Sequence, residues 1–95
     1  MTRHVDKLIA QNITKLGAYD EIPHYSQDLT DTWQVVEALS RKSLGVSVMS
    51  WPDGVEVNVF DTNGNRVVRL FDEMLTEAEA ICVAALSPEV LEKLE

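Results

Sequence analysis

The stretch LGVSVMSWPDGVEVNVFDTNGNRVVRLF, residues 44–71, determines which fold class this chain can adopt. Its apolar residues alternate with other residues, and this period of two is typical of β-strands. Turn-forming segments at residues 51–54 and 62–65 interrupt the alternation, and Asn63-Gly64 is a strong hairpin signal. Two short turns in succession predict a three-stranded antiparallel meander within residues 43–71.

The predicted sheet carries apolar side chains on both faces. One face is formed by Val46, Val48, Val55, Val57 and Val59. The other face receives Met49, Trp51, Phe60 and part of the third strand. A sheet with one face in water would be more polar on that face. We therefore expect helices or a partner chain to cover at least part of each face, and a homodimer rather than a monomer.

Two helices are predicted before the meander. Residues 3–16 and 28–41 space their apolar residues as a helix does, with a connector at residues 18–27 between them. Gly17 is placed to end the first helix, and Ser26 or Asp28 can cap the second. One face of the second helix carries Leu29, Trp33, Val36 and Leu39, and we expect Trp33 to pack on the sheet.

One or two helices are predicted after the meander. Thr76 and Glu79 form a capping box that opens a third helix. Ser87 and Pro88 then begin a short terminal helix, as cap and first helical residue. The expected order is α-α-β-β-β-α-α, in a single α+β domain that covers residues 1–95.

The charge excludes some classes of partner. Lys and Arg number 8 and Asp and Glu number 16, so the net charge is −8. This charge repels phosphate backbones and anionic membranes, so we expect neither direct nucleic-acid binding nor a membrane role. The acidic surface either keeps the protein soluble or binds a basic partner. The single cysteine, Cys82, lies in an apolar run and is expected to be buried, in a protein of the reducing host cytoplasm.

The sequence holds no pattern of catalytic or metal-binding residues, so we expect a protein that is not an enzyme and needs no cofactor. Ser26 lies two residues from His24, but alternate positions of an extended chain point apart, which disfavours a nucleophile and base. Residues 61–65 resemble the start of a calcium loop, yet the acidic ligand expected later is missing. A hairpin turn is the better interpretation.

Six residues remain as candidates for binding. They are Tyr25, Ser26, Asp28, Trp51, Arg66 and Arg69. Aromatic side chains supply rigid contact area, and the two arginines can meet an anionic ligand. Each also has a structural interpretation: packing for Tyr25, capping for Ser26 and Asp28, and exposure at a loop or sheet edge for the others.

Two segments resemble the phage ABA-sandwich domain family. Residues 23–37, Pro-His-Tyr-Ser-Gln-Asp-Leu-Thr-Asp-Thr-Trp-Gln-Val-Val-Glu, are similar to that family's Pro-x-Tyr-Ser-x-Asp followed by Trp-x-Val-Val-Glu. Residues 79–86 are similar to its Ala-Ile-Cys-x-Ala-Ala-Leu ending. The resemblance implies a phage or prophage gene, a three-layer α-β-α packing and no known catalytic residues. The extension after residue 87 is longer than in the usual member.

The functional hypothesis is a phage accessory protein that acts by binding. We expect a protein partner in host defence or regulation, because the charge favours a basic surface and no deep pocket is needed. Sequestration of a small nucleotide is the alternative, and it would need arginine and an aromatic ring to converge in a pocket. A structural phage protein without a ligand is the third hypothesis.

Overall fold

The computed structural model describes residues 3–17 and 19–94 of the chain. Ala18 of the connector and Glu95 of the terminal extension lie outside the described residues. The elements are α1 (Arg3–Ile9), the π-helical turn η1 (Ala10–Thr14), α2 (Leu29–Arg41), β1 (Gly45–Trp51), β2 (Gly54–Phe60), β3 (Arg66–Asp72), α3 (Glu77–Ala85) and α4 (Pro88–Leu94). The predicted α+β class and the predicted order of helices and strands are confirmed.

The three strands form an antiparallel meander in the order β1-β2-β3. Val57 and Val59 of the central strand are buried and pair with valines of β1, so the predicted valine face is confirmed, and the structure shows that it is the core face. The loop after β2 is a hairpin turn. The Asp61 carboxylate accepts hydrogen bonds from the backbone N–H groups of Asn65 and Asn63, at 3.0 and 2.9 Å. These two hydrogen bonds hold the pKa of Asp61 below its ordinary value.

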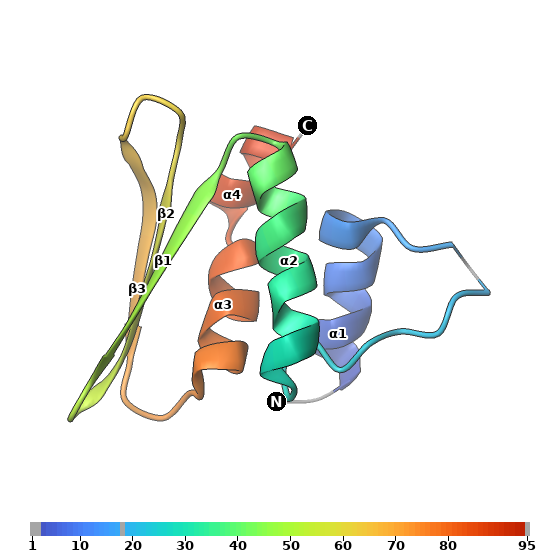
Figure 1. Cartoon of the computed structure of the whole chain (residues 1–95), viewed down its shortest axis with the longest axis horizontal. Helices are drawn as coiled ribbons and strands as arrows, with labels where there is room; N and C mark the ends of the chain where they lie inside the picture. Colours follow the sequence, from blue (N-terminus) through green and yellow to red (C-terminus); the bar gives the residue numbers. More distant parts are fainter. Residues whose placement is uncertain (1–2, 18, 95) are drawn as a thin grey trace.

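Helix α3 lies between the sheet and the N-terminal helices, as Figure 1 shows. It consists largely of small residues, and Ala80, Cys82 and Ala85 have no exposed surface. Small side chains allow α2 and the sheet to approach α3 closely on opposite sides. All described helices consequently pack on one face of the sheet, α1 is the layer farthest from it, and the other face is uncovered (Figure 1). The described helices thus do not cover part of each face, and cover of the second face by a partner chain stays a prediction.

Two details of the N-terminal helices differ from the sequence prediction. The first helix ends in η1, and Lys15 takes the left-handed conformation (φ 57°) that was expected at Gly17. Trp33 was predicted to pack on the sheet, but its side chain is 58% exposed. The buried residues of α2 are Thr32, Val35 and Leu39. The Thr32 hydroxyl lies on this buried face, where the backbone carbonyl oxygens of Tyr25 and Asp28 are its acceptors, and Trp33 lies about 100° away around the helix.

A buried carboxylate holds the connector between η1 and α2. Asp6 is fully buried, accepts the N–H of Ser26 at 2.9 Å and forms an ion pair with Arg3 at 2.7 Å. Arg3 also donates to the carbonyl oxygens of Ile22 and Pro23. These bonds fix the chain on both sides of Tyr25, whose ring is fully buried in the core.

None of the described helices combines the length and the apolarity needed to cross a bilayer.

The burial of Cys82 leads to a prediction about alkaline stability. Desolvation, followed by the nearby charge of Asp6, raises the pKa of the thiol from 9.0 to about 12. Because the unfolded thiol ionises first, this contribution to stability is complete below pH 9 and is lost as the pH rises toward 12. In urea titrations between pH 8 and 11, unfolding free energy should fall more steeply for the wild type than for Cys82→Ala, by up to about 1.4 kcal/mol per pH unit. If the unfolding free energies of the two proteins fell equally with pH, the raised pKa of Cys82 would be contradicted.

Candidate functional site

The uncovered face of the sheet, here called the outer face, is the candidate site. Its side chains are those that alternate with the buried valines in the strand register. They are Ser47, Met49, Trp51, Glu56, Asn58, Phe60, Arg66, Arg69 and Phe71. Met49 and Trp51 are 39% and 48% exposed, so the face presents large apolar side chains to solvent.

A polar network crosses the middle of the outer face. Arg69 donates to Glu56 Oε1 at 3.0 Å, and Asn58 Nδ2 donates to Glu56 Oε2 at 2.8 Å. Arg66 donates to Asn58 Oδ1 at 3.5 Å, so the network links β2 to β3. The hydrogen bond from Asn58, followed by the charge of Arg69, holds the pKa of Glu56 below its ordinary value. Glu56 is therefore an ionised, positioned carboxylate at neutral pH.

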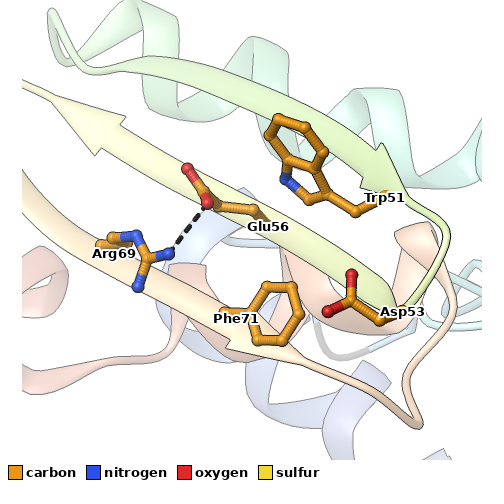
Figure 2. A pocket seen from close by; sticks show the side chains of 5 residues that line it. All are labelled: Trp51, Asp53, Glu56, Arg69 and Phe71. Atoms are coloured by element: carbon orange, nitrogen blue, oxygen red, sulfur yellow. Dashed lines mark hydrogen bonds and ion pairs between the residues drawn. The ribbon is translucent and has the colours of Figure 1, made fainter.

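An open hollow of about 420 Å³ lies at one end of this network, beside the β1–β2 turn. Figure 2 shows the residues that line it, which are Trp51, Asp53, Glu56, Arg69 and Phe71. The indole of Trp51 and the ring of Phe71 come from the two edge strands, and Glu56 lies on the strand between them. The hollow thus combines two aromatic rings with charges of both signs.

Gly54 positions the ring of Phe71 in this hollow. A Cβ atom added at Gly54 would lie 2.7 Å from Phe71 Cζ and 2.6 Å from the Asp72 carbonyl oxygen. Both distances are too short, so the ring and β3 reach their positions only because residue 54 has no side chain. Phe71 is paired with Glu56 in the strand register, so its ring reaches Gly54 from a diagonal position and covers backbone that the glycine leaves exposed.

The structure brings three of the six predicted binding residues together. Trp51 and Arg69 line the hollow, and Arg66 lies on the same face. Arg66 and Arg69 are three residues apart, and in a regular strand they would point to opposite faces. The register shifts by one residue between Val59 and Phe60, which leaves Val67 as a β-bulge and turns both arginines to the outer face.

The other three predicted residues lie elsewhere and support the fold. Tyr25 is fully buried, and its hydroxyl is 2.9 Å from the Thr14 hydroxyl. Ser26 is also buried, and its Oγ has no hydrogen-bond partner among the described residues. Asp28 caps α2 by accepting the Thr30 N–H at 2.9 Å. The capping role predicted for Ser26 or Asp28 therefore belongs to Asp28.

Sequence analysis did not single out Asp53, Glu56, Asn58 and Phe71 as site residues. The strand period already placed Glu56 and Asn58 opposite the valines, but their association with Trp51 depends on the register between strands. Asp53 was interpreted as a turn residue. Within the part of the chain that the structure describes, no group of three His, Cys, Asp or Glu side chains is arranged to hold a metal ion.

A comparison with protein families matches this chain to the phage ABA sandwich domain, over residues 1–86. The chain belongs to the phage ABA sandwich domain family. Comparisons with curated proteins and with solved structures give no significant match. The family match includes both segments that suggested the resemblance and stops before α4 (Pro88–Leu94), which forms the terminal extension.

The family's two sequence segments lie mainly in the packing around α3. Tyr25 and Val35 from the first segment and Ile81 and Cys82 from the second belong to one hydrophobic core. The outer face belongs to the matched residues but to neither of these segments. Within the family fold, the segments that identify this chain thus stabilise the helical layers, whereas the outer face carries the candidate site.

Substitutions at two glycines test how the hollow is built. Gly54→Ala should destabilise the protein by about 1–3 kcal/mol, because the new methyl group must displace the Phe71 ring and the β3 backbone. Gly45→Ala is the matched control in the same sheet, since nothing lies within 4 Å of its added Cβ, and it should change stability by less than about 0.5 kcal/mol. Urea unfolding measures both, and equal effects would contradict the role of Gly54.

Proposed function

We propose that this chain is a non-catalytic phage or prophage accessory protein that binds a protein partner through the outer face of its sheet. The observation that carries the proposal is the uncovered sheet face itself. Exposed Met49 and Trp51 of β1 lie beside a network of fixed charges on β2 and β3 there. Aromatic and long apolar side chains beside ordered polar groups are the usual composition of the centre of a protein interface.

The shape and charge of the outer face favour a protein over a small molecule. Small-molecule sites usually enclose most of the ligand, whereas this hollow lies open on a sheet surface. The net charge of −8 would speed encounter with a basic partner, and the affinity would then fall with salt. A component of host defence or regulation is the partner class that the phage setting of the family suggests.

The non-catalytic part of the proposal rests on the state of two nucleophilic side chains. Cys82 is fully buried and its raised pKa keeps the thiol protonated. The Ser26 hydroxyl is buried as well. We therefore expect no turnover of phosphodiester, ester or peptide substrates, and a turnover abolished by changing one residue would contradict the proposal.

Nucleotide sequestration remains a second candidate because Trp51 and Arg69 line the same hollow. A base can stack on the indole while the guanidinium meets a phosphate. This candidate is less favoured, since Arg69 already pairs with Glu56 and since Asp53 adds a further negative charge. A phosphate group bound by the remaining N–H groups of Arg69 would face both carboxylates.

Capture from host lysate with matched variants tests the proposed function. We expect a protein that co-purifies with the wild type and with Trp33→Ser but not with Met49→Ser/Trp51→Ser. Trp33 is an exposed tryptophan of α2, so this control removes an aromatic side chain of the same kind from a different surface. Mass spectrometry of the denatured sample identifies any released small molecule.

The outcomes of this capture separate the three functional hypotheses. A released nucleotide without a protein partner would overturn the proposal in favour of sequestration. A partner whose recovery ignores the outer-face variant would contradict the assigned surface. Recovery of neither would favour a structural phage protein without a ligand.

A second copy of this chain is the alternative occupant of the outer face. The homodimer expected from the sequence would cover Met49 and Trp51, and it would separate when they are replaced by serine. Light scattering at high micromolar concentration should then give two chain masses for the wild type and one for Met49→Ser/Trp51→Ser. One chain mass for both proteins would rule out the homodimer and leave the face free for another partner.

A further inference from the structure

The hollow on the outer face has a chemistry that identifies one kind of occupant. Its walls are the rings of Trp51 and Phe71, and Figure 2 shows the carboxylates of Asp53 and Glu56 at opposite ends of the space between these rings. The faces of aromatic rings carry partial negative charge and attract cations. Aromatic walls and carboxylates therefore act in the same direction on a positively charged group.

The two carboxylates differ in how far they are already neutralised. Glu56 accepts one hydrogen bond from Arg69 and one from Asn58, so both of its oxygens are engaged. Asp53 is exposed and makes no hydrogen bond or ion pair with the residues that the structure describes. The hollow thus holds two carboxylates and one guanidinium, and its excess negative charge lies at Asp53.

We propose that this hollow receives the side chain of a lysine or arginine of the protein partner, an inference that rests on the proposed function. The apolar stem of that side chain would lie against the rings of Trp51 and Phe71, and its charged end would reach Asp53. The Arg69–Glu56 pair already holds one guanidinium against a carboxylate at the edge of the same hollow. The net charge of the whole chain, −8, favours the same basic partner.

An anionic occupant fits the same residues less well. It would face the carboxylates of Asp53 and Glu56, and Arg69, the one guanidinium of the lining, already donates to Glu56 Oε1. A cation meets two carboxylates against one guanidinium, and the polar network of Arg69, Glu56 and Asn58 stays intact.

A titration of the full chain with side-chain analogues tests this inference without knowledge of the partner. The probes are n-butylammonium chloride for lysine and ethylguanidinium chloride for arginine, with n-butanol as the neutral analogue at equal ionic strength. The indole N–H signals of Trp51 and Trp33 are followed by NMR and are distinguished with Trp51→Phe. We expect a saturable shift of the Trp51 signal with at least one cation, and no matching shift at Trp33 or with n-butanol.

Matched charge variants assign the effect to Asp53. Asp53→Asn should weaken binding of the cation by about fivefold, because it removes one charge in direct contact. Glu92→Gln makes the same change in net charge at an exposed position of α4 and should leave the affinity unchanged. Equal weakening by both variants would show that only the overall field acts and would overturn the inference.

Two further results would also overturn the inference. One is an equal shift of both indole signals by the cations, and the other is saturable binding of adenosine monophosphate where the cations do not bind. Neither result is the same as failure of the proposed function, which the lysate capture with Met49→Ser/Trp51→Ser measures separately. If recovery of a protein partner depended on the outer face but the hollow bound no cation, only the present inference would be contradicted.

Discussion

The burial of α3 is the constraint on which the rest of the structure depends. Ala80, Cys82 and Ala85 are completely buried, and the helix has too few polar residues to present a face to water. A short helix that is apolar on all sides must be covered on all sides. The sheet covers one side of α3, and α1 and α2 cover the other. Both helical layers are therefore used on one face of the sheet, which leaves the outer face open.

A buried ion pair and its hydrogen bonds hold the N-terminal half of the chain in this packing. Asp6 and Arg3 bind the connector by its backbone groups, and a buried carboxylate is tolerated there because both of its oxygens have donors. The connector thereby places Tyr25 in the core and starts α2 at Asp28. Three of the six residues proposed for binding thus take part in this packing, since Tyr25 and Ser26 are buried and Asp28 caps α2.

The sequence predicts elements well where one local period dominates, and it fails where the outcome depends on partners distant in the chain. The valine alternation identified the core face of β1 and β2, and Thr76 and Glu79 form the expected capping box. The orientation of Trp33 could not be predicted, because a polar residue, Thr32, occupies the buried face and has the Tyr25 carbonyl oxygen, a partner in the connector, as its acceptor. The alternation of side chains along a regular strand would likewise have placed Arg66 and Arg69 on opposite faces of the sheet. Only the β-bulge brings them to one face.

Two sets of charges act on the candidate site: the net charge of the whole chain at long range and the charged side chains of the hollow at contact. Both are negative. The net charge of −8 acts over about 8 Å at physiological salt, so it affects encounter more than the final contact. Within the hollow, Asp53 and Glu56 outnumber Arg69, so the short-range contacts also favour a cation. For a basic protein surface the two effects add. For a nucleotide they oppose both approach and binding, and stacking on Trp51 would have to offset them. The same arginine and tryptophan that suggest an anion site therefore lie in surroundings better matched to a cation.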